Sequence, residues 1–519
     1  MLLNIYMSEV KIEQGEIDKY TIKADNVIFE VSIFKDKDQF VPVYFIKIPK
    51  IEPASQALLE DIRDKILLAV PINIESLRNP DALNVLRSKI MEMARDMIKK
   101  AVKDISDEIL DFLVLTIANE MLGLGNLDII IEDENLEEIV INGSKNPVWV
   151  YHKRYGWLIS NLVVESEEQI ANYASIIGRR VGRQINILEP LMDASLLSGD
   201  RVNATLFPIS AQGNTLTIRR FRKNPWTITD LIKNNTLDYK TASFLWLAVQ
   251  YELSMIIAGG TASGKTTLLN VILPFVPPNE RIISIEDTKE LRLPDFLHWV
   301  SLSTRSPNPE GKGEVSMLDL MINSLRMRPD RIVVGEIRRQ SEAEVLFEAI
   351  NTGHSVYATL HANTAAEAFR RLTSPPINLP KDLVLSLPMF TVMFRQRKLK
   401  IRRIFEISEV NQLKSGEIVT HTIKQWDAKL DKLQDVDSSL RIYDEINLFT
   451  GMTKNEIEKD LHEKEQVLRF LVSNNINTVN TVGKVISEYY SNKEEFMKIM
   501  DKKYAVDKIL GNLKTELSS

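Results

Sequence analysis

"IIAGGTASGKTTLLN", residues 256–270, is the stretch that decides the fold of this chain. Within it, residues 259–266 match the pattern G-x-x-x-x-G-K-[ST], a loop whose backbone N–H groups converge on a polyphosphate. A β-type run precedes it and a helix-forming run follows, which is the required context; the alternative is a glycine turn with a surface lysine. Lys265 is expected to reach the β- and γ-phosphates, and the Thr266 hydroxyl to ligate Mg²⁺. The candidate nucleotide-binding residues here are Gly259, Gly260, Thr261, Ala262, Ser263, Gly264, Lys265, Thr266 and Thr267.

Downstream of this loop, strand-like and helical segments alternate. The runs SMIIAGG, RIISIE, RIVVGE and SVYATLH are apolar, and helical patterns are expected between them at 266–273, 316–328 and 341–351. This alternation is typical of βαβ units. The sequence therefore predicts an α/β domain built on a parallel sheet.

Acidic side chains follow two of these runs. Glu336 ends RIVVGE, and because ligands bind where parallel strands end, it is expected to hold Mg²⁺ through water. Glu286, Asp287 and Glu290 follow RIISIE, where a carboxylate could accept a proton from an attacking water. The alternatives are a carboxylate that caps a loop at Glu336 and solvated loop charges in the second cluster.

Two of only six histidines, His354 and His361, flank the run SVYATL seven residues apart. A metal pair, a catalytic base and a phosphate sensor are all open on chemistry alone. A zinc pair would favour closer spacing and further ligands, so the spacing argues against a metal.

Composition sets outer limits. The chain has 519 residues, 44% hydrophobic and 26% charged, a length that suggests about three globular units. The absence of cysteine excludes disulfides and thiolate metal sites. A net charge of −6 argues against a dedicated nucleic-acid binder. Neither a signal segment nor a membrane span is expected, because no run is long and apolar enough.

Changes in pattern along the chain suggest five regions. We expect a helical and β extension at 1–120, an α+β domain at 121–225 and a linker at 226–240. The P-loop core is expected at 241–400, followed by a β-strand and charged helices at 401–519.

The order of these motifs resembles the type II/type IV secretion ATPase superfamily. It is carried by GGTASGKT, IEDTKEL, RMRPDRIVVGEIR and TGHSVYATLHANTA, and by the upstream segments at 125–157 and 189–206, so that it spans about residues 120–410. The segment VYHKRYG and the lack of cysteine favour the archaeal branch over bacterial relatives with a tetracysteine zinc element. Within that branch the chain looks most like the archaellum motor ATPase.

The resemblance implies a RecA-like core, ATP and Mg²⁺ as ligands, and specific roles. Glu290 would be the water-activating base, Glu336 the Walker B carboxylate and Arg338 part of the family signature. His361 would sense the γ-phosphate, whereas a functional or a structural role for His354 stays open. The acidic box reads EDTKE where many bacterial relatives have a proline after the aspartate.

The family also completes its nucleotide site with arginines from the preceding domain. The candidates are Arg201, Arg219, Arg220 and Arg222. By resemblance we expect a homohexameric ring motor in the cytoplasm, at the inner face of the cell membrane. It would act on a polytopic membrane platform protein with other archaellum or pilus components, and without nucleic acid. The alternatives are an archaeal pilus or type II-like secretion ATPase, a conjugation-type nucleic-acid translocase, and a nucleotide-gated scaffold that does not hydrolyse ATP.

Overall fold

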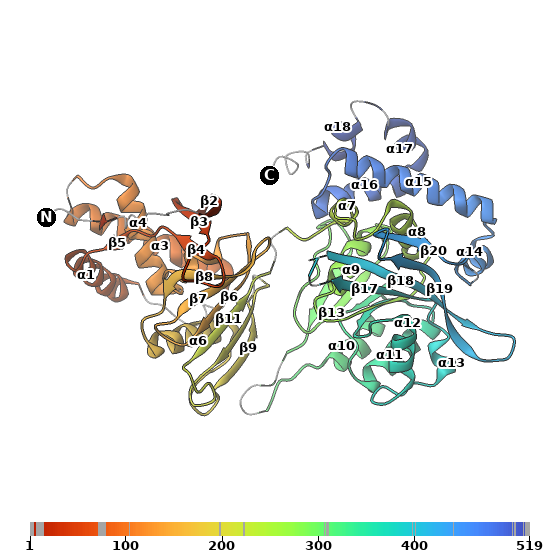
Figure 1. Ribbon diagram of the computed structural model, residues 1–519, viewed down its shortest axis with the longest axis horizontal. Helices are drawn as coiled ribbons and strands as arrows, with labels where there is room; N and C mark the ends of the chain where they lie inside the picture. The colour runs from red at the N-terminus through yellow and green to blue at the C-terminus, as the bar shows by residue number, and fades with distance from the viewer. Residues whose placement is uncertain are drawn as a thin grey trace. The chain divides into compact units, whose positions relative to one another are not determined.

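The computed structural model divides the chain into two compact units, Met1–Lys223 and Asn224–Ser519 (Figure 1). It describes residues 5–6, 15–70, 79–102, 104–196, 199–221, 224–305, 307, 311–396, 398–399, 401–439, 441–500, 502, 505–511 and 513. Each unit is built around a sheet of nine strands.

The first unit carries a mixed sheet in the order β2-β3-β4-β8-β7-β6-β11-β10-β9. Its strands are β2 (Glu16–Ala24), β3 (Val27–Phe34), β4 (Val43–Ile46), β6 (Leu136–Asn142), β7 (Pro147–His152), β8 (Gly156–Val163), β9 (Leu191–Ser195), β10 (Arg201–Thr205) and β11 (Thr215–Arg219); β1 (Ile5–Tyr6) pairs with β5 (Lys50–Ile51) apart from them. The helices are α1 (Pro53–Ala69), α3 (Pro80–Ala101), α4 (Asp107–Leu122), α5 (Leu127–Ile131) and α6 (Glu167–Val181).

The boundary expected near residue 120 does not separate two compact units. Strand β4 pairs in parallel with β8, so the first strands of the chain join the sheet of the later ones. The hydroxyls of Tyr20 and Tyr44 donate to the buried carboxylate of Asp133 at 2.7 and 2.8 Å, which fixes the same junction. Sequence patterns miss this because the pairing joins segments more than 100 residues apart.

The second unit has the sheet order β14-β13-β15-β16-β12-β17-β18-β19-β20. Its strands are β12 (Met255–Gly259), β13 (Ile282–Glu286), β14 (Trp299–Ser303), β15 (Arg331–Val334), β16 (Ser355–Leu360), β17 (Met389–Gln396), β18 (Ile401–Gln412), β19 (Ile418–Asp427) and β20 (Lys432–Asp435). The strands from β14 to β17 are parallel and those from β17 to β20 antiparallel. The α/β class with a RecA-like parallel core is confirmed.

Helices cover both faces of this sheet (Figure 1). Met255 and Ile257 of β12 belong to one buried core, and the alternating Ile256 and Ala258 belong to a second core on the opposite face. The helices are α7 (Ile228–Lys233), α8 (Tyr239–Gln250), α9 (Lys265–Ile272), η1 (Leu273–Phe275), α10 (Met317–Ser324), η2 (Leu325–Met327), α11 (Gln340–Asn351), α12 (Ala365–Thr373), α13 (Lys381–Val384), α14 (Arg441–Thr450), α15 (Lys454–Ser473), α16 (Val479–Ser491), α17 (Lys493–Met500) and α18 (Ala505–Leu510).

The expected linker at 226–240 is folded into the second unit. Ile228, Leu231 and Ile232 are buried in its core, and the Thr229 hydroxyl donates to the Ile476 carbonyl at 2.6 Å. The division between the units falls instead at residues 223 and 224. The polar "KNN" cluster suggested a linker, but it marks only the end of α7.

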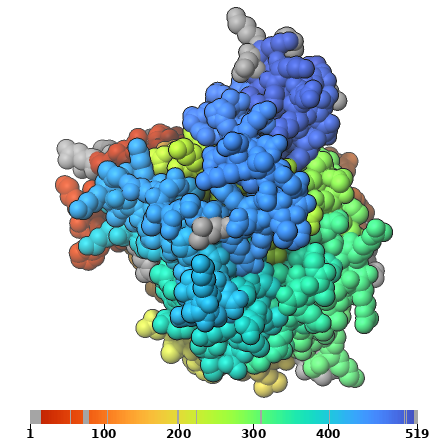
Figure 2. All heavy atoms as spheres, turned by 90° about the vertical axis from the view of Figure 1, so that its right-hand side faces the viewer, coloured from red at the N-terminus to blue at the C-terminus, as the bar shows by residue number. Residues whose placement is uncertain are grey.

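The C-terminal helical region is confirmed, and it packs on the second unit. In Figure 2 the blue C-terminal residues form a continuous mass at the top of this unit. Trp246 of α8 stacks on Phe275 with ring centroids 5.0 Å apart, and its Nε1 donates to the Tyr490 hydroxyl at 2.7 Å. Tyr490 in turn donates to the Phe275 carbonyl at 2.7 Å, so α16 braces the segment that follows α9. In the described part of the chain, no helix is suited in length and apolarity to cross a membrane.

A buried ion pair lies in this packed region. Lys464 and Asp460, one turn apart on α15, are hydrogen-bonded, and Lys464 is fully buried. Burial lowers the pKa of Lys464 to about 8, which Asp460 opposes. Asp460 also accepts from Lys493 at 2.9 Å and from the Tyr489 hydroxyl at 3.2 Å.

Removing Asp460 should lower the free energy of unfolding more than removing Lys464. Asp460→Ala leaves the ammonium of Lys464 buried without its carboxylate and should cost roughly 3–5 kcal/mol. Lys464→Met should cost less, because Asp460 keeps the ammonium of Lys493 and the Tyr489 hydroxyl. Denaturant unfolding followed by tryptophan fluorescence measures both, and a larger loss in Lys464→Met would contradict the account.

Candidate functional site

The glycine-rich loop connects β12 to α9, and its backbone conformation requires glycine at two positions. A Cβ on Gly259 would lie 2.4 Å from Ser263 Oγ and 2.6 Å from the Met393 carbonyl oxygen, so only glycine fits there. Gly264 has φ +100°, which favours glycine. The loop therefore turns tightly at the carboxyl end of a buried strand and opens directly into a helix N-terminus, the geometry expected for binding phosphate.

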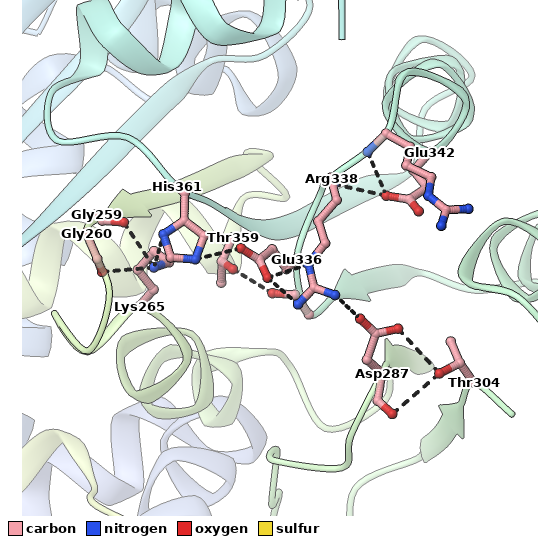
Figure 3. A network of polar contacts seen from close by, with 12 residues as sticks. Gly259, Gly260, Lys265, Asp287, Thr304, Glu336, Arg338, Glu342, Thr359 and His361 are labelled. Carbon is pink, nitrogen blue, oxygen red and sulfur yellow. Dashed lines mark hydrogen bonds and ion pairs between the residues drawn. The ribbon is translucent and has the colours of Figure 1, made fainter. Parts of the chain in front are cut away.

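The ammonium of Lys265 lies at the centre of the site (Figure 3). It donates to the carbonyls of Gly259 and Gly260 at 3.0 Å each and lies 3.3 Å from His361 Nδ1. Burial lowers its pKa, and the charges of Glu336 and Glu290 oppose that shift. The loop thus holds its own lysine on two neutral acceptors, which a phosphate can replace.

His361 follows β16 and connects the lysine to a carboxylate. Its Nε2 lies 2.8 Å from Glu336 Oε1. Because an ammonium can only donate, Nδ1 must accept from Lys265, and the proton of a neutral ring then lies on Nε2 and is donated to Glu336. Burial, followed by the charge of Lys265, lowers the pKa of His361, which favours this neutral form.

Glu336 continues the chain of contacts to the next strand end. Arg338 NH2 lies 2.6 Å from Glu336 Oε2, and Arg338 NH1 lies 2.6 Å from Asp287 Oδ2. The Thr304 hydroxyl donates to Asp287 Oδ1 at 3.3 Å. As Figure 3 shows, polar contacts therefore run from the loop across the ends of β16, β15 and β13.

Glu286 anchors the acidic loop. Its Oε1 accepts from the backbone N–H groups of Glu290 at 2.9 Å and Leu291 at 3.1 Å. Its Oε2 is buried without a hydrogen-bond partner among the described residues, and burial raises the pKa of this carboxyl to about 7. Glu286 is thus a positioning residue for the half-buried Glu290, whose charge acts on Lys265.

Comparison with known proteins identifies the family. Residues 193–393 match the family model described as "Type II/IV secretion system protein". The type IV secretion system protein PtlH of Bordetella pertussis is 33% identical over 263 residues, covering 46% of this chain and 76% of that protein. The chain belongs to the type II/IV secretion ATPase superfamily.

Relatives of this chain occur in archaea and bacteria. An uncharacterized protein of Methanocaldococcus jannaschii is 34% identical over 410 residues, which cover 78% of this chain and 73% of that protein. A putative conjugal transfer protein of Mycobacterium tuberculosis is 34% identical over 260 residues, which cover 49% of this chain and 73% of that protein. The solved structure of the Legionella pneumophila ATPase DotB aligns at 19% identity over 73% of this chain and 93% of that one, with a TM-score of 0.38.

His354 and His361 lie at opposite ends of β16. His354 precedes the strand, and its Nδ1 lies 3.3 Å from the Ala349 carbonyl oxygen and 3.2 Å from Thr352 Oγ1, at the end of α11. The six residues of β16 lie between them and span roughly 20 Å of backbone, so His354 contacts its own turn and not the site. No group of three His, Asp or Glu suited to a metal occurs within the described ranges.

Two residues near the glycine loop carry oxygen ligands of the kind that Mg²⁺ binds. Mg²⁺ binds through oxygen ligands, usually one or two protein groups together with substrate phosphates and water. Thr266 supplies a half-buried hydroxyl at the start of α9, and Glu336 supplies a carboxylate near Lys265. These two residues would hold the ion.

The arginines expected to complete the site lie in the first unit. Arg201 of β10 and Arg219 of β11 are direct cross-strand partners, and Arg220 donates to the Asp133 carbonyl. Arg222 lies outside the described residues. Contact of these arginines with a nucleotide stays a prediction.

Sequence reasoning missed one arginine at the loop. Arg402 of β18 donates from Nε to the Ala262 carbonyl at 3.1 Å. The signal was the arginine-rich run before IFEISEV, but only the folded hairpin brings it to a loop 140 residues earlier.

The buried carboxyl of Glu286 predicts a pH-dependent stability. Its pKa rises from 4.5 to about 7 on folding, so its contribution is fully present below pH 4.5 and is lost as pH rises through 7. Glu286→Gln keeps the acceptor but not this titration. Denaturant unfolding should show the variant gaining on the parent protein between pH 5 and 8, by roughly 3 kcal/mol at most. A difference independent of pH would contradict the assignment.

Proposed function

We propose that this chain is a Mg²⁺-dependent ATPase, cleaving ATP to ADP and phosphate to drive a ring motor. The observation that carries the proposal is a pair of contacts beside the glycine loop: Lys265 lies against His361, and His361 lies against Glu336. Family membership supports it, since the signature residues of the family are the ones that meet here.

The contacts suggest how the residues act on ATP. Phosphate oxygens are stronger acceptors for an ammonium than neutral carbonyls, so Lys265 is expected to leave Gly259 and Gly260 for the β- and γ-phosphates. The backbone N–H groups of the loop and the start of α9 would hold the same phosphates. When bound, Mg²⁺ neutralises charge that develops on the phosphates during transfer.

Glu290 is the proposed general base for the attacking water. The carboxylate lies at the end of the acidic loop that Glu286 fixes by two backbone hydrogen bonds. Its charge acts on the ammonium of Lys265, which supports the proposed position near the terminal phosphate. A proton taken from the attacking water would pass to the carboxylate of Glu290.

His361 is the proposed reporter of the terminal phosphate. While Lys265 faces Nδ1, the ring is neutral and donates to Glu336. Movement of Lys265 onto a phosphate removes that donor and frees Nδ1, so the hydrogen bonding of Glu336, Arg338 and Asp287 can change with the nucleotide. Loss of the phosphate would restore the original contacts of His361 and Glu336. The change would thereby signal hydrolysis across the ends of β16, β15 and β13.

We further propose a homohexamer at the inner face of the cell membrane, with a polytopic platform protein as partner. The output would be assembly or rotation of an archaellum or a related type IV pilus-like filament. Arg201, Arg219 and Arg220 are proposed to complete a nucleotide site, and domain movement would transmit the cycle. The archaeal relative that aligns over most of the chain supports the archaeal assignment.

A nucleic-acid translocase is the second candidate, favoured by the likeness to a putative conjugal transfer protein. The net charge of −6 argues against it. Filter binding of single- and double-stranded DNA at 50 and 200 mM salt decides. We expect no salt-sensitive binding in the presence of ATP; affinity that falls steeply with salt would favour the translocase.

Two substitutions test the ATPase proposal and exclude a non-hydrolysing scaffold. Lys265→Ala should reduce ATP turnover at least about 100-fold, because it removes the cation that follows the phosphate charge. Glu290→Gln should reduce turnover similarly while ATP still binds. Phosphate release and nucleotide titration measure the two effects. Undiminished turnover in Lys265→Ala would end the assignment.

A further inference from the structure

The β17–β18 hairpin brings a second cation to the glycine loop. Arg402 Nε donates to the Ala262 carbonyl at 3.1 Å. A Cβ built on Gly264 would lie 3.5 Å from Arg402 Cδ and 3.4 Å from Met393 Cε, so the arginine stem lies against the loop itself. Arg402 is an exposed residue, so its guanidinium is accessible to a ligand from solvent.

The neighbouring Arg403 shows what a structural arginine looks like in the same strand. Its side chain is buried and forms a bidentate ion pair with Asp431. Nε donates to Oδ1 at 2.7 Å and NH2 donates to Oδ2 at 2.6 Å. Successive residues of a strand point to opposite faces, so Arg402 faces away from that carboxylate and toward the loop. Of two adjacent arginines, one supports the fold and the other lies at the candidate site.

The charge of the hairpin points to an anion. Six of the nine residues from 395 to 403 are lysine or arginine. Arg402 lies directly opposite Arg395 in the β17–β18 register, and like charges placed this way destabilise a strand pair. A phosphate beside Arg402 would offset that repulsion.

The order of strands tells which end of a nucleotide Arg402 would meet. The sheet runs β15-β16-β12-β17-β18, so the glycine loop after β12 has His361 and Glu336 on its β16 side. Lys265 faces that side, where the terminal phosphate is expected. Arg402 approaches from the β18 side, at the opposite flank of the loop.

We propose that Arg402 is a nucleotide-binding residue that contacts the phosphate nearest the nucleoside, the α-phosphate, from outside the glycine loop. The inference rests on the proposed function, because it assigns a residue to the same nucleotide site. ATP and ADP share the α-phosphate. Arg402 therefore strengthens binding of both nucleotides equally and contributes little to the chemical step.

Arg402→Gln tests this, with Lys398→Gln as the matched control. Both remove one positive charge from the same hairpin, but Lys398 is exposed near the hairpin tip. Titration of the full chain with ADP and with ATP should show about tenfold weaker binding of each in Arg402→Gln. The KM for ATP should rise by a similar factor with kcat within about twofold, and Lys398→Gln should match the parent protein.

Two further measurements separate phosphate binding from support of the loop. The parent protein's affinity for ADP should fall more steeply with salt than that of Arg402→Gln, because only a charge contact is screened. Arg402→Lys, which keeps the charge, should recover part of the affinity. In thermal unfolding without nucleotide, Arg402→Gln should be no less stable than the parent protein, because it removes the repulsion between Arg402 and Arg395.

The outcomes are distinct. A parent protein that neither binds ADP nor hydrolyses ATP refutes the proposed function, and the role of Arg402 with it. A parent protein that binds ADP, together with an Arg402→Gln variant of unchanged affinity and salt dependence, refutes the role of Arg402 alone. Equal losses in Arg402→Gln and Lys398→Gln, or a fall in kcat at unchanged ADP affinity, also overturn it.

Discussion

The contact on which the site depends is that of the Lys265 ammonium with the two carbonyls of its own loop and the ring of His361. A cation can be buried only where acceptors surround it. The carbonyls of Gly259 and Gly260 are available because the loop turns too tightly for any side chain at Gly259. The ring of His361 is available because β16 ends beside β12. The loop conformation and the strand order thus both provide hydrogen-bond acceptors for Lys265.

The sheet gives these contacts their rigidity. Strands β12, β13, β15 and β16 are buried along their whole length, with cores on both faces. Their parallel direction brings the carboxyl ends to one edge, where Glu336, His361 and the acidic loop gather. The C-terminal helices pack beyond the far end of α9, since the Tyr490 hydroxyl donates to the Phe275 carbonyl. Helix α9 therefore begins at the glycine loop and ends against the last helices of the chain.

Much of the site could be predicted from the sequence because its residues are tied to local patterns. The glycine loop, Glu336 and His361 each follow a short buried run, and parallel strands bring such positions together whatever lies between them. The partners of these residues could not be predicted. That Glu286 holds the backbone of Glu290, and that Arg338 bridges Glu336 and Asp287, depends on side-chain directions that spacing does not give.

The domain divisions failed for a related reason. Pairing of β4 with β8, and burial of Ile228 and Leu231, are long-range events that composition does not report. Polar clusters that suggest a linker can also end a helix, as the cluster after α7 does. In the same way, the many charges in the last hundred residues gave no sign that Lys464 and Asp460 form a buried pair. Lys464 lies over the ring of Trp246 in α8, a contact that the sequence does not indicate.

A crystal structure with Mg²⁺ and a non-hydrolysable ATP analogue tests the central claim most directly. We expect the triphosphate in the glycine loop, with Lys265 Nζ moved from the carbonyls of Gly259 and Gly260 onto phosphate oxygens. We also expect Glu290 to face the terminal phosphate. A loop that stays empty at saturating analogue, with Lys265 still on both carbonyls, would contradict it.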